Sequence, residues 1–99
     1  MEATNSETLQ RTIAFDCDGT LLDHRDNPRF EVIEMVHGYF KQGWRIIIWS
    51  GGGELYARRI AEKLGLTDIS TQHSKTIPVK PQVAVDDQDV TLGVINFRV

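Results

Sequence analysis

The sequence predicts a three-layer α/β fold built on a parallel sheet. Short apolar runs at residues 12–15, 44–49 and 83–85 have the length and β-prone composition of buried strands. Each run ends in polar residues that can bind ligands, as strands of open parallel sheets do at their carboxyl ends. The unbroken Ile46-Ile47-Ile48 is typical of a strand buried on both faces.

Two helical stretches lie between the first three predicted strands. After a charged loop at residues 23–27, the first helix is expected to begin with Asn27 as N-cap and Pro28 in the first helical position, and to end at Gly43. Its apolar residues at helical spacing are Phe30, Ile33, Val36 and Phe40. The second helix is expected over residues 54–64, with Gly65 as its stop. Its inward residues are expected to be Leu55, Ile60, Ala61 and Leu64.

The two ends of the chain carry the remaining elements. Residues 1–10 are polar without periodicity and are expected to be a flexible tail, and residues 11–99 a single domain. A short third strand is expected at residues 68–72. The two prolines within residues 73–82 favour an extended connection over a crossover helix. A fourth strand is expected at residues 83–86 and a fifth at 92–97.

Size and composition indicate a small globular domain. Of the 99 residues, 40% are hydrophobic and 25% charged, with a formal net charge of −3, which gives no reason to expect non-specific nucleic-acid binding. A single cysteine cannot form an internal disulfide, which fits a reducing compartment. No apolar run reaches the roughly 18 residues of a membrane span, and no signal-peptide core is visible. We therefore expect a cytoplasmic protein without membrane association.

Two pairs of carboxylates follow predicted strands. Asp16 and Asp18 come directly after the first strand, and Asp86 and Asp87 end the fourth. Burying carboxylates close together is unfavourable unless a positive charge neutralises them. Hard oxygen donors suit Mg²⁺ better than Zn²⁺, so the pairs predict a magnesium site.

In its order of motifs, the sequence resembles the haloacid dehalogenase superfamily of phosphohydrolases. That family has Asp-x-Asp-x-Thr after the first strand, here Asp16 to Thr20, and Ser or Thr after the second, here Ser50. A lysine follows, and then an acidic pair after the fourth strand, here Asp86-Asp87. The resemblance covers nearly the whole chain from Thr12 onward.

The resemblance implies a Rossmann-like sheet of order 3-2-1-4-5 and a set of catalytic roles. The first and fourth strands would then be neighbours, which brings Asp16 to Asp86. Asp16 matches the family's nucleophile, which forms an aspartyl-phosphate, and Asp18 its general acid. Mg²⁺ would be held by the Asp16 carboxylate, the Asp18 backbone carbonyl and Asp86, with Asp87 as an orienting group or a ligand through water.

A phosphate site is expected where the second strand ends. The Ser50 hydroxyl and the backbone N–H groups from Gly51 onward precede a helix, and helix N-termini bind anions. The lysine of the site is ambiguous. Lys80 would lie roughly 20 Å from Asp86 along an extended strand, whereas Lys75 can stay on the active face. Lys80-Pro81 nevertheless matches a pairing common in the family, so Lys75 is expected to be catalytic and Lys80 is kept as a phosphate-binding candidate.

An aspartate at position 18 goes, by family pattern, with phosphatases and phosphotransferases. Residues 21–27 and 65–83 leave no room for the cap domain that usually closes over small substrates, so an open, capless site is expected. Such a site suits a broad range of phosphate monoesters, a macromolecular phosphate end, or a lid supplied by a second subunit. The alternatives are a phosphate-sensing module, such as a receiver domain, and a catalytically silent module of the same fold.

Overall fold

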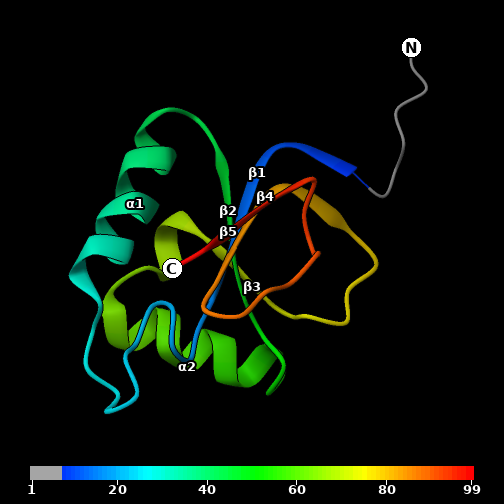
Figure 1. Ribbon diagram of the computed structural model, residues 1–99. Helices are drawn as coiled ribbons and strands as arrows, with labels where there is room; N and C mark the ends of the chain where they lie inside the picture. Colours follow the sequence, from blue (N-terminus) through cyan, green and yellow to red (C-terminus); the bar gives the residue numbers. More distant parts are fainter. Residues whose placement is uncertain (1–7) are drawn as a thin grey trace.

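A computed structural model describes residues 8–99 of the protein (Figure 1). These residues form a five-stranded parallel sheet of order β3-β2-β1-β4-β5 with two α-helices, which confirms the predicted strand order. The elements in chain order are β1 (Thr8–Asp16), α1 (Phe30–Lys41), β2 (Arg45–Ser50), α2 (Glu54–Leu64), the short 3₁₀ helix η1 (Thr67–Ile69), β3 (Thr71–Ser74), β4 (Lys80–Asp86) and β5 (Ile95–Arg98).

Both helices lie on the same face of the sheet, so the prediction of three layers is wrong (Figure 1). Right-handed crossovers explain this arrangement. The steps from β1 to β2 and from β2 to β3 run in one direction across the sheet, which puts α1 and α2 on one face. The steps to β4 and β5 run the other way, so their connections belong to the opposite face. Those connections, residues 75–79 and 87–94, contain no helix, as predicted for the first of them.

Side chains alternate along the strands, so each face of the sheet has its own apolar cluster. The main core joins the helices to one face, and its strand residues are Ile13, Phe15, Ile46, Ile48, Val83 and Val85. The smaller cluster covers the other face and consists of Ala14, Ile47, Trp49 and Ala84, with Ile77 and Leu92 from the two helix-free connections packed against it.

Several strand boundaries differ from the prediction. β1 and β4 begin earlier because they pair with each other, with Thr8 opposite Lys80. Residues 8–10 of the predicted tail are therefore part of β1, and residues 1–7 lie outside the described residues. η1 takes the start of the predicted third strand, which shifts β3 to residues 71–74. Asn96 accepts hydrogen bonds from the N–H groups of Leu92 and Gly93, and this turn delays β5 to Ile95.

The first helix starts later than predicted. Asn27 and Pro28 belong to the preceding loop, where Pro28 bridges to Leu22, and Arg29 is the N-cap of α1. Val32 and Val36 form the buried stripe of α1, whereas Phe30 and Phe40 are 71% and 44% exposed. Within residues 8–99, no helix has the length and apolar character needed to cross a bilayer.

The second helix has the predicted bounds but not all of the predicted inward residues. Leu55 is 70% exposed, and Ala57 is buried in its place. Ala57, Ile60 and Ala61 follow the i, i+3, i+4 spacing of one helix face. Leu55 precedes Ala57 by two positions, which turns it roughly 200° away from that face.

Candidate functional site

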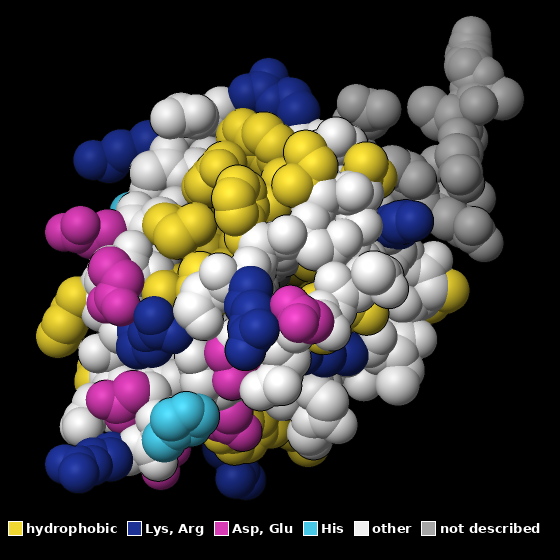
Figure 2. Space-filling view, viewed as in Figure 1, with side chains coloured by type: hydrophobic (Ala, Val, Ile, Leu, Met, Phe, Trp, Pro, Cys, Tyr) yellow, Lys and Arg dark blue, Asp and Glu magenta, His cyan; other side chains and the backbone are white. Residues whose placement is uncertain are grey.

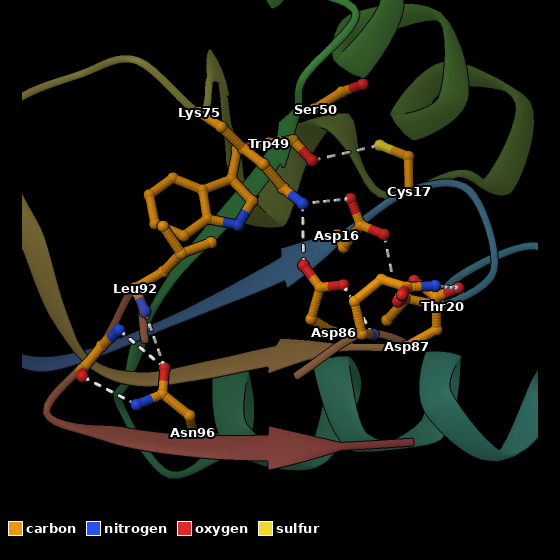
Figure 3. A network of polar contacts seen from close by, with 12 residues as sticks. Asp16, Cys17, Thr20, Trp49, Ser50, Lys75, Asp86, Asp87, Leu92 and Asn96 are labelled. Atoms are coloured by element: carbon orange, nitrogen blue, oxygen red, sulfur yellow. Dashed lines mark hydrogen bonds and ion pairs between the residues drawn. The ribbon is translucent and has the colours of Figure 1, made fainter. Parts of the chain in front are cut away.

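The carboxyl ends of the strands gather the predicted polar residues at one edge of the sheet (Figure 3). Asp16 ends β1, Ser50 ends β2, Lys75 follows β3 and Asp86 ends β4. β1 and β4 are the neighbours at which the strand order reverses, and in open α/β sheets ligands bind in the crevice at that point. The fold therefore brings these residues to the place where a ligand site is expected.

Three carboxylates form a cluster at this edge. Asp16, Asp86 and Asp87 each offer an oxygen atom, and these atoms lie within 4.8 Å of one another. Asp16 and Asp86 are 7% and 1% exposed, so their charges are largely removed from water. Buried carboxylates at such spacing repel unless a cation or a proton neutralises them. The donor set suits a hard divalent cation such as Mg²⁺, and the cluster could hold one.

Lys75 connects two of the three carboxylates. Its Nζ lies 2.8 Å from Asp16 Oδ1 and 2.7 Å from Asp86 Oδ2 (Figure 3). The Lys75 backbone N–H donates to the carbonyl oxygen of Ser50 at 3.1 Å, which holds the chain over the end of β2 and lets the side chain reach across β1. The structure thus places Lys75 at the cluster.

Lys80, the other candidate lysine, lies at the opposite end of the sheet. It is the first residue of β4, whereas Asp86 is the last. At about 3.3 Å per residue the two are roughly 20 Å apart, so the structure does not bring Lys80 to the predicted phosphate site.

The protonation of the cluster follows from burial and charge. Burial raises the pKa of the Asp16 carboxyl to about 6, and the neighbouring Asp86 charge adds to this although Lys75 opposes it. Burial alone would lower the pKa of Lys75, but hydrogen bonds and charges from Asp16 and Asp86 raise it above its usual value. Lys75 therefore stays charged, and Asp16 is the cluster residue that takes up a proton when the pH falls through 6.

The turn after β1 is built around Gly19, whose φ of +81° is in the left-handed region. A Cβ at this position would overlap the Asp87 carboxylate, so the absence of a side chain lets Asp87 lie against the turn. The Arg29 guanidinium donates to the Gly19 carbonyl at 2.8 Å, and the Thr20 hydroxyl donates to Asp16 Oδ2 at 3.3 Å. Gly19 and Thr20 thus shape the turn.

Asp18 is not one of the three clustered carboxylates. Its side chain is exposed and accepts a hydrogen bond from the Tyr56 hydroxyl at 2.5 Å. This hydrogen bond is the main reason why the pKa of Tyr56 is raised to about 12, so the phenol remains a donor. Sequence reasoning did not identify Tyr56. Tyr56 lies in the first turn of the helix that follows Ser50 and three glycines. This closeness in sequence to the predicted phosphate site is the signal that could have identified it.

Ser50 and Gly51 occupy the start of the loop before α2. The buried Ser50 hydroxyl accepts a hydrogen bond from the Gly52 N–H at 2.9 Å and keeps its own proton to donate. Gly51 is exposed. The N-cap of α2, Gly53, makes no side-chain capping bond, so the first N–H groups of the helix remain available to an anion.

Cys17 lies between the two acids of the first motif but is no nucleophile. Its buried thiol donates to the Trp49 carbonyl at 3.6 Å. Burial, followed by the charges of Asp16 and Asp18, raises the pKa of the thiol to about 12, so it stays protonated at neutral pH.

An open cavity of about 280 Å³ adjoins the cluster on the side of Asp18. It is lined by Asp18, Gly19, Asp23, His24, Asp26, Tyr56 and Asp87. The loop at its rim is tight, because the Asp23 carboxylate accepts the N–H groups of Arg25 and Asn27. Four of the seven lining residues are aspartates, so the lining of this cavity is largely acidic.

The site combines a nucleophile candidate, a carboxylate cluster that could hold a cation and open backbone donors at one sheet edge. Comparisons with protein-family models, curated proteins and solved structures found no match to this chain.

Proposed function

We propose that this protein is a Mg²⁺-dependent phosphomonoester hydrolase that acts through an aspartyl-phosphate on Asp16. The observation that carries the proposal is the convergence of Asp16, Asp86 and Asp87 with Lys75 at the carboxyl ends of β1 and β4. Three carboxylates against one ammonium leave an excess of negative charge, which a divalent cation would neutralise. The motif order seen in the sequence gives these residues a consistent set of roles.

Mg²⁺ would be held by Asp16, Asp86, Asp87 and the Asp18 backbone carbonyl, and would supply positive charge against the phosphoryl oxygens. The Ser50 hydroxyl and the Gly51 N–H would orient the phosphoryl group through its remaining oxygens. An Asp16 oxygen attacks phosphorus and the bond to the leaving oxygen breaks. Asp18, which enters the reaction as the carboxylic acid, gives that oxygen its proton and becomes a carboxylate.

In the second half of the reaction, Asp18 takes a proton from a water molecule as that water attacks the aspartyl-phosphate. The phosphorus bond to Asp16 breaks, inorganic phosphate is formed, and both aspartates return to their starting states. Lys75 remains protonated throughout. Its positive charge compensates the negative charge of the Asp16 carboxylate before the attack and that of the phosphoryl group afterwards. The Tyr56 hydroxyl donates to Oδ1 of Asp18 in either protonation state and would hold this side chain beside the cavity through which the leaving group departs.

The open site supports a substrate that brings its own contacts, or a lid supplied by a second copy of the chain. The cavity beside Asp18 carries the carboxylates of Asp18, Asp23, Asp26 and Asp87. Their charge favours neutral or cationic leaving groups over polyanionic ones such as long nucleic acids.

The experiment is release of inorganic phosphate from an aryl phosphate with Mg²⁺ and with a chelator. We expect Mg²⁺-dependent turnover that Asp16→Asn abolishes and Asp18→Asn reduces strongly. Asp68→Asn is the matched control, because Asp68 is an exposed acid in η1, which precedes β3, whereas the cluster lies at the carboxyl ends of the strands. A folded Asp16→Asn variant with nearly full activity would refute the mechanism. Phosphate binding without any turnover would favour a phosphate-sensing or silent module instead.

A further inference from the structure

The indole nitrogen of Trp49 is a polar atom in apolar surroundings. The residue is 1% exposed, and its indole packs with Ala14 and Ala84 on the helix-free face of the sheet. Among the residues that the structure describes, Trp49 Nε1 is the buried side-chain nitrogen or oxygen that lacks a hydrogen-bond partner. A buried N–H without a partner destabilises a protein, because it has lost its hydrogen bond to water and gained none in return. A phenylalanine would avoid this effect, so the exception needs a physical explanation.

The position of the indole relates it to the carboxylate cluster. Trp49 is the register partner of Asp16, so their side chains share one face of the sheet. Ala14 and Ala84 precede Asp16 and Asp86 by two positions in β1 and β4, and their small side chains make room for the ring across both strands. The indole therefore lies next to the carboxylate cluster, on the side that faces the middle of the strands.

The nitrogen-bearing edge of the ring faces the site. In Figure 3 the strands run toward Asp16 and Asp86, and the indole nitrogen is on the edge of the ring turned toward Lys75 and Asp86. Lys75 has three ammonium protons, of which the ion pairs with Asp16 and Asp86 account for two. The Trp49 indole N–H and the remaining ammonium proton of Lys75 are thus two donors that the printed ion pairs leave unused.

We propose that the Trp49 indole N–H donates a hydrogen bond to a phosphoryl oxygen of the ligand bound at the cluster. This assignment rests on the proposed function, because it takes the ligand to be a phosphate. It explains why an indole rather than a phenyl ring occupies the position: the N–H is left unpaired in the free protein and gains its acceptor when phosphate binds. Trp49 is thus a substrate-binding residue in addition to its packing role.

The direct test is nuclear magnetic resonance of the protein with ¹⁵N-labelled tryptophan and glycine, titrated with inorganic phosphate in the presence of Mg²⁺. We expect the Trp49 indole N–H signal to move downfield as phosphate binds. Trp44 is an internal control, since its ring lies before the start of β2 and contacts Tyr39. The Gly51 amide reports independently whether phosphate occupies the proposed site.

The second test is the variant Trp49→Phe, with Trp44→Phe as its matched control. We expect Trp49→Phe to weaken phosphate binding about tenfold, the loss of one hydrogen bond to a charged group. Its stability without phosphate should change little, because the cavity left by the smaller ring is offset by the removal of the unpaired N–H. A purely structural role for Trp49 would give the opposite pattern, with lower stability and unchanged phosphate affinity.

The outcomes separate this assignment from the proposed function. If the Gly51 amide moves with phosphate while the Trp49 indole does not, the role of Trp49 is refuted and the hydrolase proposal stands. If phosphate moves neither signal at any concentration, both are refuted. If Trp49→Phe does not fold, the indole signal of the unmodified protein still decides.

Discussion

The two faces of the sheet use the same strands for different purposes. On the face covered by α1 and α2, the inward residues of the central strands are apolar, as at Phe15, Ile48 and Val85. On the other face, the neighbouring positions carry Asp16, Trp49 and Asp86. Alternation along a strand allows this separation, because adjacent side chains point to opposite faces. The residues that stabilise the core and the candidate site residues are therefore adjacent in sequence but lie on opposite faces of the sheet.

The difference between the faces also shows why the thinner one carries the site. Residues 75–79 form a helix-free connection, so Lys75 can lie over the end of β2 and extend to the acids. A crossover helix would instead bury this face with apolar side chains, as the helices do on the other. The second cluster is accordingly small, with only Ile77 and Leu92 contributed by the connections.

On the face that carries the site, the variant expected to have the largest effect is Lys75→Met. We expect a loss of turnover of about 10³-fold, because the positive charge beside the proposed nucleophile and the proposed phosphoryl position is removed. Mg²⁺ affinity should rise rather than fall, since a cation leaves the neighbourhood of three carboxylates. Phosphate release and Mg²⁺ titration calorimetry measure the two effects. Lys80→Met, at the other end of β4, should change neither, and an equal effect of the two variants would contradict the assignment.

The opposite face is tested by Ile48→Ala, next to Trp49 on β2. Ile48 is fully buried, and truncation should lower the free energy of unfolding by about 2–5 kcal/mol. Tm should then fall by ~4–8 °C for each kcal/mol lost. Mg²⁺ affinity per folded molecule should be unchanged, because the lost contacts are on the helix side. Denaturant melts with a Mg²⁺ titration at low temperature provide both numbers. A large loss of Mg²⁺ affinity in the folded variant would show that the two faces are coupled.

The pH dependence of stability is a property of the site face. In the folded protein burial raises the pKa of Asp16 to about 6, from 3.8 for an unperturbed carboxyl. Between these values the folded state holds a proton that the unfolded state has released. The metal-free protein should therefore lose stability as pH rises from about 4 to 6, by at most ~3 kcal/mol, and then level off.

This decline should disappear when Asp16 no longer titrates. Asp16→Asn removes the carboxyl, and saturating Mg²⁺ keeps it ionised in the folded state. Urea melts at several pH values, with and without Mg²⁺, measure the slope in each case. A slope that is unchanged in Asp16→Asn would assign it to another group.

A smaller effect is expected from Gly19→Ala, which forces a side chain between the turn and Asp87. The added Cβ overlaps the Asp87 carboxylate and requires a positive φ, so Asp87 must move. Displacing such a group should weaken Mg²⁺ binding about tenfold or more. Gly51→Ala is the matched control, because a Cβ there meets no atom within 4 Å. Calorimetry with Mg²⁺ on both variants decides, and equal affinities would exclude Asp87 from the metal site.

The sequence pattern predicted the central strands and most of the residues that the site brings together, and the resemblance of its motif order to a known family implied the strand order that the structure has. Apolar runs ending in Asp16, Ser50 and Asp86 specify strands whose carboxyl ends meet, because a parallel sheet aligns them at one edge. The spacing of Lys75 and Lys80 along the chain also favoured the lysine that the structure places there. The strand ends and the lysine depend on local composition and on distance along the chain, which can be read directly from the sequence.

The tertiary structure decided the features that depend on contacts between distant segments. The number of layers followed from which face each crossover takes, and the contact of Gly19 with Asp87 from the approach of two loops. The hydrogen bond of Tyr56 to Asp18 and the unpaired nitrogen of Trp49 likewise arise only when separate elements pack. Helical spacing does not reveal that Leu55 is exposed. Spacing shows which residues share a face of the helix, but not which faces other elements cover.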